Sequence, residues 1–337
     1  MDKYVVFCSK SEWFKYMFLD SQKKADVFVA RNGISPFGSK GVNGFVSELF
    51  FSTKVSFLFP RIVCLKHYLY RRISGCLKFK YDDRVILIFT DTNKLSHDKE
   101  FIQYCRKHYK NVVLVRWFLD LMDIALLPEE QELSFCRSNY DVIITYDQRE
   151  AKKYDFKFVE SPYSRDITIS KRKTNYDIVF VGTAKMERDS GKRYKRIIEA
   201  YHYFKSKGLK LKFYIFGVPE NDQIKSNDIV YNTYLPYREV LKLNMESKCI
   251  LEITQENETG TTLRLFEAIA YKKKLVISNV DIVNNPLFNP KQMFVFKNVH
   301  DIDLDFIVND EKCEYSSPDI ISSSCFFKTI SKLCDNQ

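Results

Sequence analysis

Short runs of apolar residues alternate along the chain with longer segments whose apolar residues recur every three or four positions. Most of the short runs are continuously apolar, which is typical of parallel strands that are covered on both faces. In the first half of the chain they predict strands at 4–8, 26–30, 85–89, 112–116 and 141–145. In the second half they predict strands at 177–181, 211–216, 228–231, 249–253, 274–277 and 293–296. Helical periodicity lies between them, for example at 193–207, 238–247 and 261–271.

The alternation of strands and helices in both halves predicts an α/β protein with two Rossmann-like, doubly wound domains. The segment 158–176 contains Pro162, several Ser and Thr residues and a basic cluster without helical period, so we interpret it as a linker. The predicted domains are 1–165 and 166–317, and 318–337 is predicted as a C-terminal helix that could pack back on the N-terminal domain. Two such domains should face each other across a cleft bordered by the loops that follow strands.

Composition narrows the class of protein. With 45% hydrophobic and 15% aromatic residues, the chain can form buried cores, which excludes a disordered protein. The net charge of +10 favours an anionic partner such as a nucleotide, a nucleic acid or a phospholipid surface, and a solvated basic surface explains it equally well. The nine cysteines form no C-x-x-C pair, and the N-terminus does not resemble a signal peptide. We therefore expect reduced thiols and a cytoplasmic location.

One stretch, QENETGTTLRLFEAIAYKKKLVISN at 255–279, joins a polar loop to a predicted helix and strand. Gly260 would let the backbone approach a ligand closely, and the start of the helix favours an anion. Thr259 or Thr261 is the predicted helix cap, and Arg264 could bind a phosphate. Glu267, one turn further on, could accept the hydroxyls of a ribose. The alternative is an ordinary capped helix with an Arg–Glu pair three residues apart.

Two other glycines follow predicted strands. Gly182 is followed by Thr183 and the basic residues Lys185, Arg188, Lys192 and Arg193, but the segment matches neither G-x-G-x-x-G nor the P-loop pattern. It could contact a pyrophosphate, and a basic surface helix is the alternative. Gly217 ends another strand, and the aromatic-rich loop at 231–241 could hold a nucleobase. Simple connections between strands and helices explain these loops equally well.

Together these segments resemble the nucleotide-sugar-binding domain of GT-B glycosyltransferases, especially the bacterial enzymes of lipopolysaccharide and capsular polysaccharide biosynthesis. The resemblance is carried by FVG at 180–182 with Lys185, by the FNP…MFVF segment at 288–296, and by the pattern of Gln255, Gly260, Thr262, Arg264, Glu267, Ala268, Lys274 and Leu275. It extends more loosely to the N-terminal half, through Trp117, Asp120, Asp123 and the segment 140–154.

The resemblance implies a metal-independent, hexosyltransferase-type enzyme that moves a sugar from a nucleoside-diphosphate donor to a hydroxyl of a glycan or lipid-linked acceptor. Domain 1–165 would then bind the acceptor and domain 166–317 the donor, with no cofactor and no nucleic acid. The backbone of Gly260, Thr261 and Thr262 with Arg264 would hold the diphosphate, and Glu267 the ribose. Thr259 stands where many retaining relatives carry a second glutamate, so the stereochemical outcome stays open.

The N-terminal half offers candidates for the acceptor side. Asp91 follows the strand 85–89 and could act as the catalytic base, with His97 nearby; a helix cap or a turn is its alternative role. The glycine-rich loop at 31–44, including Gly41 and Gly44, could bind the acceptor or be a plain surface loop. The segment 57–80 mixes apolar and basic residues, which suits peripheral contact with an anionic membrane or an ordinary core helix.

Three other functions fit parts of the sequence. A nucleotide-sugar epimerase with the same two-domain architecture would act on the donor without an acceptor. A nucleic-acid-binding protein would explain the +10 charge, but the basic residues are spread along the chain and no nucleic-acid-binding module is present. A binding partner without catalytic activity is the third.

Overall fold

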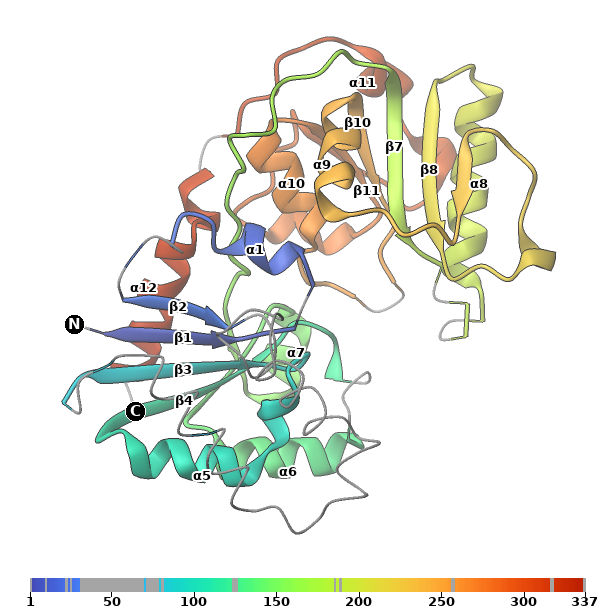
Figure 1. Cartoon of the computed structure of the whole chain (residues 1–337). Helices are drawn as coiled ribbons and strands as arrows, with labels where there is room; N and C mark the ends of the chain where they lie inside the picture. The colour runs from blue at the N-terminus through green and yellow to red at the C-terminus, as the bar shows by residue number, and fades with distance from the viewer. Residues whose placement is uncertain are drawn as a thin grey trace, which may run out of the picture. The chain divides into compact units, whose positions relative to one another are not determined.

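The computed structural model describes residues 2–9, 11–21, 24, 26–30, 70, 79, 82–122, 127–184, 186–187, 190–255, 258–315 and 318–335. The contacts divide the chain into two compact units. Unit 1 comprises Met1–Ser164 together with Ser322–Gln337, and unit 2 comprises Arg165–Ile321. Each unit is built around its own parallel β-sheet (Figure 1).

In the described part of unit 1, six parallel strands form a sheet in the order β2-β1-β3-β4-β5-β6. The strands are β1 (Lys3–Phe7), β2 (Val27–Ala30), β3 (Arg84–Thr90), β4 (Asn111–Phe118), β5 (Val142–Thr145) and β6 (Lys157–Phe158). Strands β1 and β3 are the switch point, because the chain builds the sheet in opposite directions from there. All predicted strands of this half are confirmed. Strand β6 was not predicted, because its two residues are too short to show a pattern.

Helices cover both faces of this sheet: α1 (Trp13–Met17), α5 (Lys99–His108), α6 (Glu129–Asn139), α7 (Gln148–Tyr154) and α12 (Ser323–Asp335). On one face Phe89 of β3 packs edge-on against Phe101 of α5. On the other face Tyr4 of β1 packs on Phe327 of α12, with 4.7 Å between ring centroids. The C-terminal helix therefore belongs to the core of unit 1, and the short 3-10 helix η6 (Pro318–Ile321) precedes it.

The sheet described in unit 2 also has six parallel strands, in the order β12-β11-β10-β7-β8-β9. These are β7 (Tyr176–Thr183), β8 (Leu211–Phe216), β9 (Ile229–Tyr231), β10 (Ser247–Glu252), β11 (Lys274–Ile277) and β12 (Met293–Val295), all of them predicted. The switch point lies between β7 and β10, because the chain adds β8 and β9 on one side before it returns to β10. Ligands of open α/β sheets bind at the carboxyl ends of the strands at such a point.

The helices of unit 2 are α8 (Lys192–Ser206), α9 (Tyr237–Met245), α10 (Leu263–Tyr271) and α11 (Leu304–Val308). Helices α8 and α11 share one hydrophobic core with β7 and β8, and α9 and α10 pack against β7, β10 and β11 (Figure 1). Leu265, Phe266 and Ala268 of α10 are buried, so its apolar side rests on the sheet. This packing fixes the start of α10 beside the end of β10.

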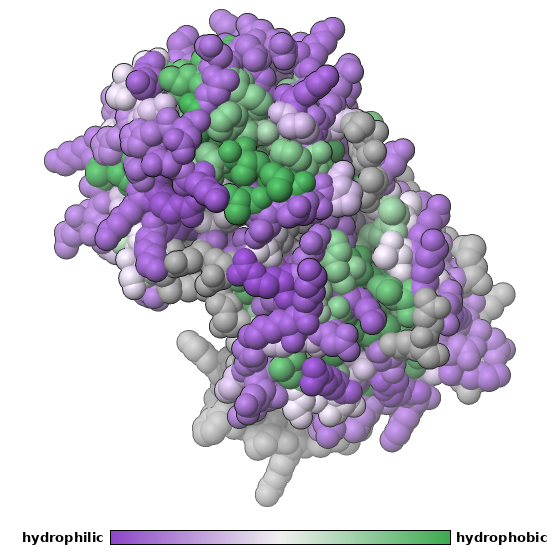
Figure 2. Space-filling model, turned by 180° about the vertical axis from the view of Figure 1, so that it is seen from behind, coloured by the Kyte–Doolittle hydropathy of each residue, from purple (hydrophilic) through white to green (hydrophobic). Residues whose placement is uncertain are grey.

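Hydrophilic side chains cover most of the face shown in Figure 2, and apolar side chains gather in separate patches. No helix among the described residues is both long and apolar enough to cross a bilayer. In the same residues, no three His, Cys, Asp or Glu side chains come together in a way that could hold a metal ion.

Candidate functional site

The polar residues that meet at the switch point of unit 2 come from the end of β7, the end of β10, the loop after β10, and the first turns of α8 and α10. The loop is held at its far end by Asn279, whose side-chain amide donates to the carbonyl oxygens of Thr259 (3.1 Å) and Gly260 (3.4 Å). Gly260 and Thr261 are buried. The predicted diphosphate cradle is therefore buried at Gly260 and Thr261 and held there by Asn279, and its contact with a phosphate stays a prediction.

The helix cap of α10 corrects the sequence interpretation. Neither Thr259 nor Thr261 caps the helix; Thr262 does, by accepting a hydrogen bond from the backbone N–H of Arg264 (3.2 Å). The prediction was wrong because three threonines stand within four residues, and any of them can cap. The geometry selects Thr262, because its hydroxyl can also donate to the carboxylate of Glu252.

Glu252 is the residue at this edge that the sequence analysis missed. It closes β10, is buried, and its Oε1 accepts from the Thr262 hydroxyl. Its Oε2 has no hydrogen-bond partner among the described residues. Burial raises the pKa of Glu252 to about 7, although Thr262 and the nearby Arg264 and Arg193 favour the charged form. The only signal in the sequence is one acidic residue inside an apolar run.

Arg264 joins α10 to β7. Its Nε and Nη2 donate to the carbonyl oxygen of Val181 at 3.3 and 3.1 Å, and its Nη1 donates to Oε1 of Glu267 at 2.5 Å. Glu267 also accepts from the hydroxyl of Tyr237 (2.8 Å) and the amide of Asn244 (2.7 Å), and it is fully buried. Because the carboxylate is fully buried among these three donors, the direct contact of Glu267 with a ribose stays a prediction.

A second arginine spans the switch point from the other side. Nε of Arg193, in the first turn of α8, donates to the carbonyl oxygen of Ile253 at 2.8 Å, and its Nη1 lies 3.5 Å from the hydroxyl of Thr183. Gly182 leaves room for the ring of Phe180, since a Cβ there would lie 2.9 Å from Cζ of Phe180, whereas its distance of 3.5 Å from Nη2 of Arg193 would be an ordinary contact. The basic first turn noted in the sequence thus contributes Arg193. Lys185 lies outside the described residues.

Gly217 occupies a turn after β8. Its φ of +78° is a conformation that favours glycine, and its N–H donates to Oδ1 of Asn232 at 2.8 Å. The side chains beside it are exposed: Phe216 keeps 53% of its surface accessible, and Tyr234, after β9, keeps 74%. Exposed aromatic rings at a ligand-binding edge offer stacking surfaces for a base. Gly217 itself allows the turn through its positive φ, and its contact with the donor stays a prediction.

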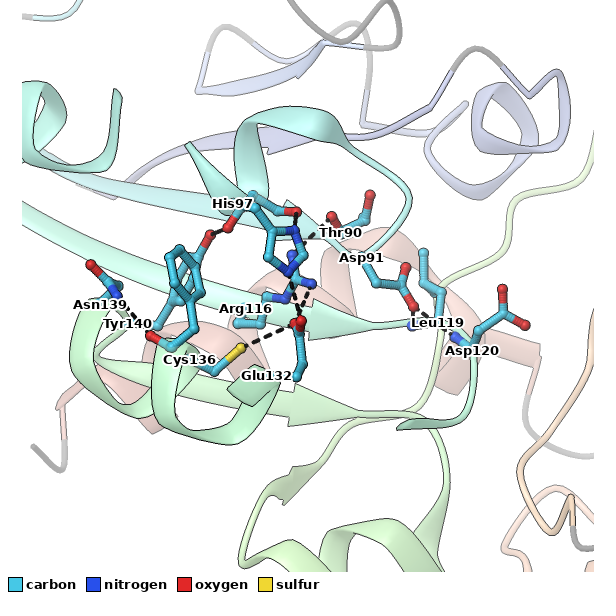
Figure 3. Close-up of polar contacts among 12 residues, drawn as sticks. Thr90, Asp91, His97, Arg116, Leu119, Asp120, Glu132, Cys136, Asn139 and Tyr140 are labelled. Atoms are coloured by element: carbon cyan, nitrogen blue, oxygen red, sulfur yellow. Dashed lines mark hydrogen bonds and ion pairs between the residues drawn. The ribbon is translucent and has the colours of Figure 1, made fainter. Parts of the chain in front are cut away.

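Asp91 in unit 1 directly follows β3 and is held by the residues that follow β4. Its Oδ2 accepts from the backbone N–H groups of Leu119 and Asp120, both at 2.9 Å, whereas its Oδ1 has no partner among the described residues (Figure 3). Burial raises the pKa of Asp91 to about 6. Its alternative role as a helix cap is wrong, because Asn93 caps the following 3-10 helix η1 (Lys94–His97).

A buried ionic cluster next to Asp91 was not predicted. Nη2 of Arg116 donates to Oε1 of Glu132 at 2.8 Å, and Oε2 of Glu132 lies 2.7 Å from Nε2 of His97 (Figure 3). Arg116 and Glu132 are almost completely buried. Figure 3 shows the Asp91 carboxylate directed toward Leu119 and away from His97, so the structure does not join the two side chains that the sequence placed near each other.

Two sequence predictions concern segments that lie wholly or mostly outside the described residues. Gly41 and Gly44, with the whole loop at 31–44, lie outside the described residues, and so does most of the segment 57–80. Within that segment Tyr70 is described: it is buried, and its hydroxyl donates to Oδ2 of Asp98 at 2.8 Å. Acceptor binding and membrane contact therefore stay predictions.

Two α/β units, each with a parallel sheet between helices, define the GT-B class of glycosyltransferase folds, and the predicted fold is confirmed. The chain is similar to Anabaena HepE in complex with UDP and glucose, with 10% identity, 99% of this chain and 100% of that chain covered, and a TM-score of 0.57. It is also similar to HepE in complex with UDP-glucose, with 9% identity, 99% of this chain and 100% of that chain covered, and a TM-score of 0.55. No protein-family model and no curated protein matches the chain.

Proposed function

We propose that the chain is a glycosyltransferase that uses a nucleoside-diphosphate sugar as donor and a hydroxyl group as acceptor. The observation that carries the proposal is the convergence of Arg193, Arg264 and the capped start of α10 at the switch point of unit 2. Cationic groups and a helix N-terminus favour a diphosphate, which is the leaving group of such a reaction. The HepE structures of the same fold were obtained with UDP and with UDP-glucose, which supports this choice of ligand.

The proposed roles follow from the contacts. Arg264 is held against the end of β7 by Val181 and Glu267, so its remaining N–H groups can stabilise the charge of the departing diphosphate. Phe216 and Tyr234 supply exposed rings for the base. In unit 1, Asp91 is the candidate base, because one of its oxygens is fixed by two N–H groups and the other is free to accept a proton.

A finer proposal concerns the biological role. We infer a hydroxyl of a glycan or a lipid-linked glycan as the acceptor, in the synthesis of a bacterial surface polysaccharide, with no metal ion taking part in the transfer. This rests on the sequence pattern at 250–279 and on the net charge of +10, which suits contact with an anionic membrane.

The experiment is a donor panel followed by product analysis. UDP-, GDP-, dTDP- and CMP-sugars are tested for thermal stabilisation of the wild type, and the best donor is then incubated with glycan acceptors in the presence and absence of EDTA. A sugar newly linked to the acceptor supports the proposal. Conversion of the donor to an epimer or to free sugar, with no acceptor product, would replace it with the epimerase function. Thermal stabilisation of the protein by nucleic acid, and by none of the nucleotide sugars, would exclude both the glycosyltransferase and the epimerase function.

A further inference from the structure

A cavity of about 390 Å³ lies at the amino-terminal edge of the unit 2 sheet. Its lining includes Ser247 and Lys274, which are the first residues of β10 and β11, so it lies at the opposite end of the strands from the candidate donor site. The segments 165–174 and 309–314 supply much of the rest. Its volume is in the range of small-molecule sites.

The lining is strongly basic. Eight lysine and arginine side chains and three carboxylates line the cavity. Lys248 is paired with Asp177 at 3.6 Å and with Asp310 at 3.4 Å. Arg172 is paired with Glu246 at 2.8 Å. The other six cations form no ion pair with any described residue: Arg165, Lys171, Lys272, Lys273, Lys274 and Lys312. The cavity therefore carries an excess of positive charge that the carboxylates of the described residues do not balance.

Lys273 is the most informative of these cations. Its ammonium donates to the carbonyl oxygens of Met245 (2.9 Å) and Ser247 (2.6 Å), and no carboxylate among the described residues pairs with it. Because an ammonium has three N–H groups, one is left for a ligand. Burial, with a smaller effect of Lys171, lowers the pKa of Lys273 to about 8. Lys274 differs, since the carbonyl oxygens of Phe306 and Asn309 and the Asn309 side chain accept its hydrogen bonds.

We propose that this cavity is a second anion site, which binds a phosphate group of a small ligand or of a lipid headgroup through Lys273 and the unpaired cations around it. A phosphate would supply the negative charge that the buried ammonium lacks, and several lysines can reach its oxygens together. The three carboxylates of the lining, Asp310, Glu311 and Glu314, would repel a ligand that carries further negative charges beside its phosphate group. The proposal does not depend on the glycosyltransferase activity, because the two sites lie at opposite edges of the sheet.

Cys313 allows the site to be observed locally. It lines the cavity and is a half-buried free thiol, whereas Cys325, the other half-buried thiol of the described residues, belongs to unit 1. Alkylation of both thiols by iodoacetamide is followed by peptide mass spectrometry, with increasing inorganic phosphate or pyrophosphate at constant ionic strength. At a concentration ten times the Kd, bound anion should slow alkylation of Cys313 about tenfold. The rate at Cys325 should not change.

Variants separate this cavity from the donor site. Lys272→Gly removes a charge at a position whose φ is +54°, where glycine is favoured, so folding should be retained. Combined with Lys171→Ala and Lys312→Ala, it should weaken protection of Cys313 by phosphate about tenfold or more. Lys225→Ala, which removes an exposed lysine in the loop before β9, is the matched control and should leave protection unchanged.

A second series of the alkylation experiment decides whether the phosphate belongs to a free ligand or to a lipid. It replaces the soluble anions with vesicles of phosphatidylcholine alone or of phosphatidylcholine with phosphatidylglycerol. Protection of Cys313 by soluble phosphate or pyrophosphate assigns the site to a free ligand. Protection by the anionic vesicles alone assigns it to a lipid headgroup, and both results support the shared chemistry. The proposal is overturned if neither protects Cys313, or if the triple variant is protected as well as Lys225→Ala.

Discussion

Replacement of Glu252 by glutamine should change how the stability of unit 2 depends on pH. Glu252 is buried at the end of β10, and one of its carboxyl oxygens has no partner among the described residues. Glutamine has nearly the same shape as a protonated glutamate and can still accept from the Thr262 hydroxyl. The substitution therefore removes the titration of this group and leaves its surroundings in place.

The magnitude follows from the pKa. Burial raises the pKa of Glu252 from 4.5 to about 7, so the folded chain keeps a proton that the unfolded chain releases. The stability associated with this proton is fully present below pH 4.5 and is lost as the pH rises through about 7. At about 1.4 kcal/mol per pKa unit, the loss amounts to about 3 kcal/mol. Glu252→Gln should therefore gain about 3 kcal/mol relative to the wild type between pH 5 and pH 9.

The assay is urea unfolding at several pH values from 5 to 9, followed by far-ultraviolet circular dichroism. Both tryptophans, Trp13 and Trp117, belong to unit 1, so their fluorescence reports that unit separately. Glu220→Gln, at an exposed position in unit 2, is the matched control and should follow the wild type. If the free-energy difference between Glu252→Gln and the wild type is the same at pH 5 and pH 9, the assignment of a raised pKa to Glu252 is wrong.

Three further predictions concern other parts of the molecule. Asp91→Asn should lower turnover about 100-fold without changing donor affinity. Because the base must be deprotonated, the wild-type rate should rise with pH through about 6. Equal turnover in the variant and the wild type would exclude Asp91 as the base. Gly182→Ala should destabilise unit 2 by about 1–3 kcal/mol in urea, because its Cβ would lie 2.9 Å from Cζ of Phe180, and an unchanged midpoint would contradict this contact. Glu132→Gln removes the carboxylate that pairs with the buried Arg116, so it should lower the free energy of unfolding of unit 1 by about 3 kcal/mol. Urea unfolding followed by tryptophan fluorescence measures this change, and a stabilised variant would refute the account.

The sequence predicted the strands well because parallel strands covered on both faces need continuous apolar runs. The run at 85–89, for example, becomes β3, in which every residue after Arg84 is buried. The ends of elements were less predictable. Thr259, Thr261 and Thr262 are equally good caps in isolation, and only the position of Glu252 beside Thr262 selects one of them.

The polar groups inside the units could not be predicted for a related reason. Arg116 stands in the apolar run of β4, and its partner Glu132 comes from α6. Glu252 likewise stands in an apolar run, and its partner lies ten positions further on. Pattern analysis identifies such residues as exceptions, but their partners depend on how strands and helices pack. Arg264 and Glu267 were predicted as ligand-binding residues, with an Arg–Glu pair three residues apart as the alternative, and the structure shows that pair.

The central claim is that a nucleoside diphosphate binds at the switch point of unit 2 through Arg264. The most direct test is calorimetric titration of UDP, or of the nucleotide that the donor panel selects, into the wild type and Arg264→Lys. Lysine keeps the charge but cannot reproduce the two contacts to the Val181 carbonyl and the one to Glu267. Arg238→Lys, at an exposed arginine of α9, is the matched control. The account predicts at least about a tenfold loss of affinity in Arg264→Lys and none in the control. Equal affinity in both variants would contradict it.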